Sequence, residues 1–293
     1  MQKLYAQVHG HGPALVLIPG GGGDAGMYED AIPSLAEHRT VITYDRRGNS
    51  RSPLEHEDDP VDVATQSADV IALLDRLGVH RAAVFGSSGG AIIALDLVTR
   101  YSDRLLCAVA HEPPVINVLE PASPERATIE GIHHLGQSKG VMRAFAAFGA
   151  MTMPNPPWLF QSQAGLALVA GATRVMVAAG RILRSLTGRE PDTMTRMLGN
   201  AEVLIGRELP AFCFDYDVDL AALRAGTAPW ALAIGAESAG RPYDRPARVL
   251  SARTGVDYVS FPGGHTVYQQ SPALFSERLA ELVKELEQCH EQD

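Results

Sequence analysis

The fold is decided by the stretch Val84-Phe85-Gly86-Ser87-Ser88-Gly89-Gly90, an apolar strand that runs directly into a glycine-serine turn. A helical run over residues 91–99 follows it. Such a turn needs small residues two places before and two places after the serine, because strand and helix then pass within van der Waals contact. Gly86 and Gly90 fill those places. The sequence therefore predicts a nucleophile elbow with Ser88 as the nucleophile.

The surroundings of this turn distinguish a catalytic elbow from an ordinary glycine-serine turn. Upstream, two strand-like runs end in Pro19-Gly-Gly-Gly-Gly23 and in Asp45-Arg-Arg-Gly-Asn-Ser50. Downstream, a strand-like run over residues 256–261 ends in Pro262-Gly-Gly-His265. A histidine after the last strand, far behind the serine, fits the order serine, acid, histidine that is typical of a catalytic elbow.

Together these pieces resemble the α/β-hydrolase family over nearly the whole chain. The matching pieces are Pro19-Gly20-Gly21, where the family usually has His-Gly-x, the run 45–50, where it usually has Asp-x-Arg-Gly-x-Gly, the elbow, and Gly264-His265. The resemblance implies a mostly parallel central sheet flanked by helices, with Ser88 as nucleophile and His265 as its base. It also implies a helical lid over the serine.

Hydrophobic patterning agrees with an α/β class of fold. Strand-like runs alternate with helical patterns, which predicts a parallel sheet with helices on both faces; the strands are expected over 15–18, 41–44, 82–85 and 106–110 and the helices over 26–37, 61–77 and 91–101. Strands at 230–234 and 256–261 and a helix at 272–290 complete the pattern. We therefore expect residues 1–113 and 210–293 to form the core.

The alternation stops between residues 114 and 209, which we expect to form a helical lid. This segment has helical patterns over 124–151, 157–186 and 192–209. Its second helix carries an apolar stripe on one side and arginines on another; the stripe is Leu166, Val169, Thr173, Val177 and Gly180, and the arginines are Arg174, Arg181 and Arg184. The apolar window 164–179 is short for a bilayer span and contains Arg174, so a buried amphipathic helix is expected there rather than a membrane anchor.

The acid of the triad has two candidates. Most family members carry it in a Gly-x-x-Asp pattern after the strand that follows the lid, but here that place reads Gly235-Ala236-Glu237-Ser238. The other family location is the end of the strand after the elbow helix, where this chain has Glu112. That placement is similar to that in the zearalenone lactone hydrolases, which use a glutamate there. We prefer Glu112 and keep Glu237 as the alternative.

Acyl transfer also needs backbone N–H donors for the developing oxyanion. The donors expected are Gly89, which follows the nucleophile, and Gly21 in the loop after the first long strand, with Gly22 as a near alternative because four consecutive glycines blur the register. The other residues expected to line the substrate site are Ser87, His111, Phe145, Phe148, Trp158 and Phe160.

Composition restricts the partners. The chain has 293 residues, a net charge of −9 and a pI near 5.6, and no basic block, which argues against nucleic-acid binding. No metal or organic cofactor is implied, because no His, Asp and Cys cluster has ligand spacing. The start of the chain lacks the apolar segment of a signal peptide. The three cysteines have no spacing typical of a disulfide framework, which is consistent with a reducing compartment. We expect a cytoplasmic protein without a membrane partner. A homodimer is possible.

Two other functions compete with hydrolysis. Gly21-x-Gly23-x-x-Gly26 with Asp45 after the next strand matches a dinucleotide fingerprint, and Arg46 and Arg47 suit a 2′-phosphate, as in an NADP-dependent oxidoreductase. Against this, no Tyr-x-x-x-Lys pair occurs. A hydrolase fold also supports perhydrolysis, cofactor-free oxygenation, rearrangement or ligand binding. The function expected is cleavage of a carboxylic ester or lactone of an apolar small molecule.

Overall fold

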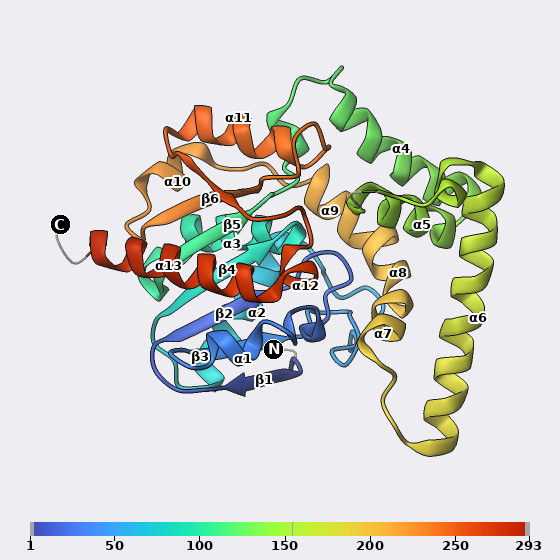
Figure 1. Ribbon diagram of the computed structural model, residues 1–293, viewed down its shortest axis with the longest axis horizontal. Helices are drawn as coiled ribbons and strands as arrows, with labels where there is room; N and C mark the ends of the chain where they lie inside the picture. Colours follow the sequence, from blue (N-terminus) through green and yellow to red (C-terminus); the bar gives the residue numbers. More distant parts are fainter. Residues whose placement is uncertain (1–2, 154, 291–293) are drawn as a thin grey trace.

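Seven strands form one sheet in the order β1-β3-β2-β4-β5-β6-β7 in the computed structural model, which describes residues 3–153 and 155–290 (Figure 1). Only β1 runs antiparallel to its neighbour. The strands are β1 (Ala6–His9), β2 (Ala14–Ile18), β3 (Thr40–Tyr44), β4 (Ala82–Ser87), β5 (Leu105–His111), β6 (Trp230–Gly235) and β7 (Tyr258–Phe261). The expected α/β class with a mostly parallel sheet is confirmed.

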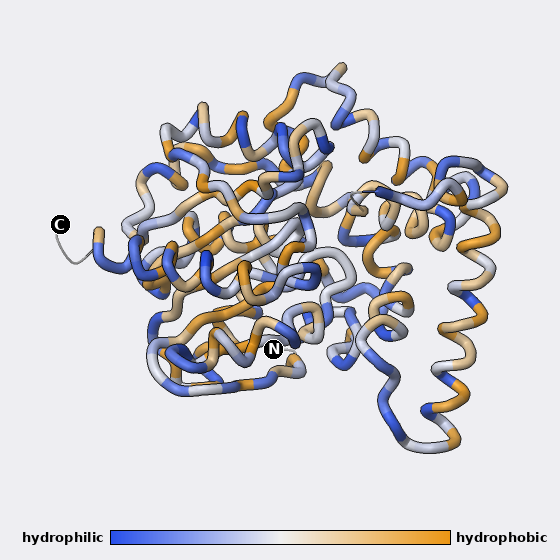
Figure 2. The backbone as a smooth tube through the Cα atoms, in the orientation of Figure 1, coloured by the Kyte–Doolittle hydropathy of each residue, from blue (hydrophilic) through white to orange (hydrophobic). Residues whose placement is uncertain are grey.

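Helices cover both faces of this sheet. The core helices are α1 (Ile32–Leu35), α2 (Val63–Arg76), α3 (Gly89–Arg100), α10 (Leu220–Ala225), α11 (Asp244–Thr254), α12 (Val267–Gln270) and α13 (Pro272–His290), joined by the 3-10 segments η1 (Ala25–Tyr28), η2 (Ser102–Arg104) and η3 (Ile116–Val118). Side chains alternate along β2, so that Val16 and Ile18 pack with α2 and α3 while Leu15 and Leu17 pack with α1 and α13. Figure 2 shows the apolar strands between these two layers.

The carboxyl ends of β2 and β4 lie side by side at the point where the strand order reverses. β3 lies on one side of β2, and the chain then crosses to place β4 on the other side. In open α/β sheets ligands bind in the crevice at such a reversal. The loop after β2 holds Gly20 to Gly23 and the turn after β4 holds Ser88, so the topology brings both to this crevice.

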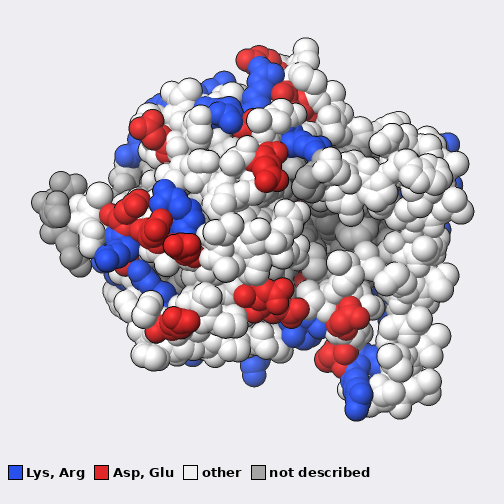
Figure 3. Space-filling model, in the orientation of Figure 1, with Lys and Arg blue, Asp and Glu red and all other residues white. Residues whose placement is uncertain are grey.

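Between β5 and β6 the chain forms helices that stand at the carboxyl edge of the sheet (Figure 1). They are α4 (Pro124–Lys139), α5 (Val141–Thr152), η4 (Trp158–Gln161), α6 (Gln163–Thr187), α7 (Thr193–Gly199), α8 (Ala201–Val203), the π-helical segment η5 (Leu204–Glu208) and α9 (Leu209–Cys213). We call this group the cap. In the view of Figure 3 its surface carries few charged side chains.

The cap differs from the sequence prediction in two respects. The single helix expected over 124–151 is two helices, because Gly140 has φ 94° and ends α4. The helix α6 was expected to be buried, but only 22% of its most apolar window is buried. Leu166, Thr173 and Val177 of the expected stripe do pack inward, whereas the opposite side of the helix is apolar and exposed.

The turn between β4 and α3 brings two backbones into closer approach than any side chain allows. A Cβ on Gly86 would lie 2.1 Å from the Gly90 carbonyl oxygen, and one on Gly90 would lie 2.3 Å from the Ile18 carbonyl oxygen. The requirement for glycine at these two places is therefore steric.

We expect Gly86→Ala to destabilise the protein by at least about 2 kcal/mol, since overpacking against backbone atoms has no flexible neighbour to relieve it. Urea denaturation measures the change. The matched control is Gly131→Ala in α4, where a Cβ meets nothing within 4 Å and a stabilisation of about 0.5–1 kcal/mol is expected. Equal effects of the two substitutions would contradict the steric requirement.

Candidate active site

Ser88 occupies the turn between β4 and α3 in a strained conformation. Its φ is 55° and its ψ is −122°, and α3 begins at the next residue, Gly89. The Ser88 amide donates to the His111 carbonyl at 2.9 Å, which ties the turn to the end of β5. Non-glycine residues adopt such angles only where the surroundings enforce them, and they cluster at functional sites.

His265 contacts Glu112 at the same edge of the sheet. His265 Nδ1 and Glu112 Oε2 lie 2.5 Å apart, and both side chains are buried. The other carboxylate oxygen, Oε1, accepts from the Gly235 amide at 2.7 Å, which links the acid to the end of β6. Glu112 directly follows β5, and its φ of 50° turns the chain at this point.

The carboxylate is held in its ionised form. Burial alone would raise the pKa of Glu112, but interactions with His111, the hydrogen bond from His265 and the nearby Ser238 hydroxyl together lower it to about 2. Burial lowers the pKa of His111 to about 4, so His111 is neutral at pH 7. Ionised Glu112 fixes the proton of His265 on Nδ1 and leaves Nε2 as the basic nitrogen.

Tyr243 and the Glu112 carboxylate together orient the imidazole of His265. The Tyr243 ring stacks on His265 with centroids 3.9 Å apart and an interplanar angle of 25°. Tyr243 is buried in the loop before α11. Nothing in the local pattern Arg241-Pro-Tyr243 marks this residue as part of a site.

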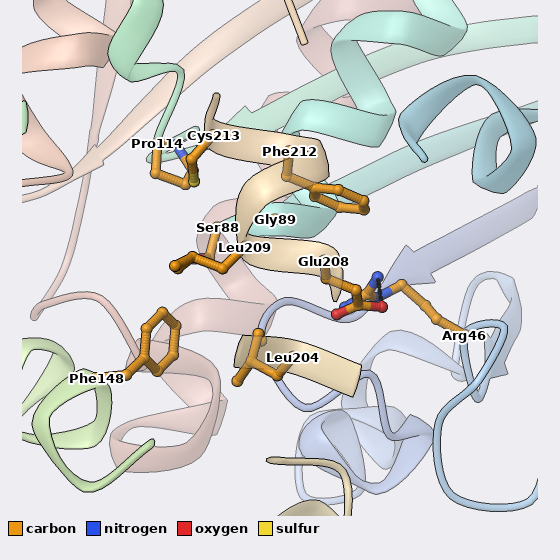
Figure 4. A pocket seen from close by; sticks show the side chains of 11 residues that line it. Arg46, Ser88, Gly89, Pro114, Phe148, Leu204, Glu208, Leu209, Phe212 and Cys213 are labelled. Atoms are coloured by element: carbon orange, nitrogen blue, oxygen red, sulfur yellow. Dashed lines mark hydrogen bonds and ion pairs between the residues drawn. The ribbon is translucent and has the colours of Figure 1, made fainter. Parts of the chain in front are cut away.

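Three glycine amides are free to bind an anion beside Ser88. Within the described residues the amides of Gly21, Gly22 and Gly89 donate to no acceptor. Gly21, Gly89 and Ser88 line one small cavity of about 30 Å³ (Figure 4). Gly22 lines the larger cavity next to it.

A buried ion pair fixes the loop that carries Gly21. Arg46 and Glu208 are both at most 2% exposed and form two hydrogen bonds of 2.7 and 2.8 Å (Figure 4). Arg46 Nη2 also donates to the Gly20 carbonyl at 3.0 Å. That carbonyl belongs to the peptide unit whose N–H is the Gly21 amide, so the guanidinium of Arg46 polarises this donor. The motif around Arg46 is visible in the sequence, but this ion pair is not, because the partner Glu208 lies in the cap.

The larger cavity beside Ser88 and His265 has a volume of ≈ 260 Å³ and no charged side chain in its lining. At ~30 Å³ for each water, this is the space of about eight or nine water molecules. Its apolar lining comes mainly from the cap and includes Met27, Phe145, Phe148, Met153, Met194, Met197, Leu198 and Leu204. Unbranched methionine side chains suit a site that adapts to the shape of its ligand.

Some of the other expected site residues line the cavity at Ser88 and others do not. Phe145 and Phe148 line the larger cavity, as expected. Ser87 and His111 are fully buried behind Ser88, where Ser87 Oγ and His111 Nδ1 are 3.3 Å apart, and they line neither cavity. Trp158 is 78% exposed and Phe160 lies beside it in η4, and neither lines the two cavities at Ser88.

The alternative acid, Glu237, does not meet His265. Its side chain is exposed, and its amide donates to the Gly263 carbonyl at the surface. Ser238, where most family members carry an aspartate, is buried beside Glu112. Only Glu112 of the two candidates contacts the imidazole.

The residues of the dinucleotide fingerprint form contacts within the protein. The Asp45 carboxylate accepts from the Ala25 amide at 2.8 Å and from Arg51 at 2.6 Å, so its oxygens are already engaged. Arg47 is paired with Asp69. These contacts hold the loops after β2 and β3 against each other, and they occupy the Asp45 carboxylate that the fingerprint assigns to a ribose.

The fold and the elbow are those of α/β-hydrolase enzymes, and comparisons with known proteins agree. A family model described as alpha/beta hydrolase fold matches residues 13–135. The chain is 30% identical over 295 residues to the uncharacterized hydrolase YraK of Bacillus subtilis (strain 168), with 96% of this chain and 93% of that protein covered. The chain belongs to the α/β-hydrolase family.

Two further similarities cover different shares of the chain. The zearalenone hydrolase of Bionectria ochroleuca is 34% identical over 113 residues, which is 38% of this chain and 43% of that protein. The solved enol-lactonase of Burkholderia xenovorans LB400 superposes with a TM-score of 0.62 at 20% identity over 97% of both chains. At this identity the structural likeness shows the fold alone.

The ionised Glu112 should make stability depend on pH. Its pKa is about 2 in the folded protein against an ordinary value of 4.5, so its contribution is fully present above pH 4.5 and is lost as the pH falls toward 2. We expect Glu112→Gln to cost on the order of 3 kcal/mol of unfolding free energy at pH 7 and much less at pH 3. Urea denaturation at both pH values measures this.

The control for this prediction is Glu237→Gln, which removes an exposed carboxylate from the neighbouring loop. Its effect should be small and nearly independent of pH. A cost for Glu112→Gln that stays the same at pH 7 and pH 3 would contradict an ionised, stabilising Glu112.

Proposed function

We propose that this protein is a serine hydrolase that cleaves a carboxylic ester or lactone of an uncharged, apolar small molecule. The observation that carries the proposal is the buried His265–Glu112 contact of 2.5 Å beside a cavity that His265 shares with Ser88. A serine hydroxyl is a weak nucleophile until a base removes its proton, and that base needs an orienting carboxylate. Ser88, His265 and Glu112 supply these three roles.

The proposed reaction has two halves. His265 Nε2 takes the proton of Ser88 Oγ as this oxygen attacks the substrate carbonyl, and the amides of Gly21 and Gly89 bind the resulting oxyanion. When the tetrahedral intermediate collapses, the leaving alkoxide takes the proton from His265 and an acyl-enzyme remains. A water then gives a proton to His265 and attacks the acyl carbon, which releases the acid and restores Ser88.

The lining of the cavity supports an apolar substrate. Its lining contains no Asp, Glu, Lys or Arg, so a charged acyl or alcohol group would lose its hydration without finding a partner. The enol-lactonase and the zearalenone hydrolase are similar to this chain, and the former is named for action on a lactone. The zearalenone hydrolase, which is 34% identical over 38% of this chain, is named as a hydrolase, and this name fits the proposed class.

We further propose that residues 114–209 act as a lid on a core of residues 1–113 and 210–293. Phe145, Phe148 and Leu204 of this segment line the cavity at Ser88. The last helix, α9, continues to Cys213, and its Phe212 lines the small cavity together with Ser88. The described cysteines are unpaired, and Cys289 is exposed, which supports the proposal of a cytoplasmic location.

The proposed mechanism is tested by labelling with a serine-reactive fluorophosphonate and by hydrolysis of neutral p-nitrophenyl esters. The adduct should form on Ser88. Ser88→Ala should abolish labelling and Glu112→Gln should lower kcat by about 10⁴-fold, because the imidazole then loses its required tautomer. Ser87→Ala and Glu237→Gln are the matched controls and should retain most activity. Labelling at another serine, or an inactive Glu237→Gln beside an active Glu112→Gln, would overturn the assignment.

Arg46 and Glu208 are proposed as positioning residues for the oxyanion site. A cation bound to the Gly20 carbonyl draws electron density from that peptide unit and strengthens the Gly21 N–H as a donor. Glu208 holds the guanidinium in place through two hydrogen bonds. Because the polarised Gly21 N–H is needed mainly for the oxyanion, loss of the polarisation should affect the transition state more than substrate binding.

Glu208→Gln should therefore lower kcat about tenfold, less than the 10²–10³ for a lost donor, with KM nearly unchanged. Affinity for a boronic-acid inhibitor, which mimics the oxyanion, should fall in parallel, with rates normalised to sites labelled by fluorophosphonate. The control is Asp69→Asn, which removes the partner of the adjacent Arg47 in the same way. An equal fall in the control, or a change in KM alone, would contradict the positioning role.

A further inference from the structure

The helix α6 forms the outer edge of the cap (Figure 1). It also presents a large apolar face to solvent. Its inner side is buried at Leu166, Ala170, Thr173 and Val177. On the other side, six large apolar side chains are between 49% and 78% exposed, namely Leu168, Val175, Met176, Ile182, Leu183 and Leu186. A monomer rarely exposes a contiguous apolar patch of this kind without a partner.

The exposed residues follow the repeat of a helix that pairs with another helix. A single line along α6 contains Leu168, Ala172, Val175, Ala179, Ile182 and Leu186, with alternating steps of four and three residues. Steps of four and three also alternate between the a and d positions of a coiled coil. We call these six residues the α6 seam. Its two alanines leave room for a close approach between helices.

Charges are kept away from the α6 seam. The positions that flank it in the repeat are uncharged, and they are Val169, Gly171, Met176, Ala178, Leu183 and Ser185. α6 has no acidic residue, and its arginines lie off the seam. Arg181 and Arg184 instead line a polar pocket with Thr195 and Asn200 of the cap, where Arg184 pairs with Glu190. Two copies of α6 can therefore meet without bringing their arginines together.

The exposed area is sufficient for a dimer. The six large side chains present apolar surface on the order of 700 Å², close to the roughly 800 Å² that each partner buries in a standard interface. The 25-residue helix is about 37 Å long, which gives the contact room to form along its length.

We propose that α6 is a dimerisation helix and that the partner of the α6 seam is α6 of a second copy of this chain. Each copy then buries its seam against the other, and the cap of one hydrolase is braced by the cap of the other. This interface is independent of the proposed catalytic chemistry, because no residue of the α6 seam lines the cavity at Ser88.

A lipid surface fits the same face less well. By length and composition α6 is able to cross a membrane, but 22% of its apolar window is buried against the protein and Arg174 interrupts that window. Helices that lie on membranes carry basic residues on a polar face that reaches the headgroups, whereas Arg181 and Arg184 turn toward the cap. The net charge of −9 opposes an anionic bilayer.

The test is the mass of the full chain at micromolar concentration, measured by light scattering after gel filtration. The wild type should have twice the chain mass of 31.3 kDa. The double substitution Val175→Glu with Ile182→Glu should be monomeric, because it places charges on the seam. The matched control is Arg181→Glu, which changes the net charge by the same two units beside the seam and should leave a dimer.

The alternative outcomes overturn the proposal. A monomeric wild type, or a double variant that stays dimeric, excludes the α6 seam as the interface. So does binding of wild-type monomer to phosphatidylglycerol vesicles that is lost in the double variant, which would make the face a lipid contact. Far-ultraviolet circular dichroism and fluorophosphonate labelling establish that the double variant is folded.

Discussion

The crossing of α3 over the end of β4 is the contact on which the site depends. Gly90 lies against the Ile18 carbonyl with no room for a Cβ, and Gly86 lies equally close to Gly90. The chain can reverse in so little space only if Ser88 adopts its strained angles, with φ 55°. That reversal raises Ser88 above the strand ends and begins a helix at Gly89, whose amide then lacks an acceptor. The nucleophile candidate and an unpaired backbone N–H beside it thus arise from one steric constraint.

Polar contacts, and not only apolar packing, attach the cap to the loops around Ser88. Arg196 of α7 pairs with Asp24 at 2.7 Å, Asn200 donates to the Gly22 carbonyl at 2.6 Å, and Glu208 pairs with Arg46. Breaking a buried ion pair is costly because it leaves an uncompensated charge, so these contacts stabilise the observed position of the cap against the glycine loop. The loop that presents Gly21 is therefore set from the cap side as well as from the core.

Strands and the elbow could be predicted because their signals are local. Apolar runs, strand-ending glycines and Gly-x-Ser-x-Gly act through sterics within a few residues, and the predicted strands lie within two residues of the observed ones. The positions of the aromatic side chains between residues 114 and 209 were less predictable: Phe148 lines the cavity and Trp158 is exposed to solvent. Both sit in helical, apolar sequence, and only the packing of α5 and η4 distinguishes them. The exposure of one side of α6 could not be predicted, because an apolar helix has the same sequence pattern whether the core or a second chain covers it.

The sequence alone determined the fold class, the order of the elements, and the place of Ser88 and His265 at the ends of strands, because short-range sterics and hydrophobic periodicity act along the chain. Only the tertiary structure decided which carboxylate meets the imidazole. Glu112 and His265 are 153 positions apart, and their contact depends on the register of β5, β6 and β7 and on the positive φ of Glu112. Glu237 is nearer in sequence to His265 but projects into solvent. Such pairings depend on how distant elements pack, and no local pattern specifies that.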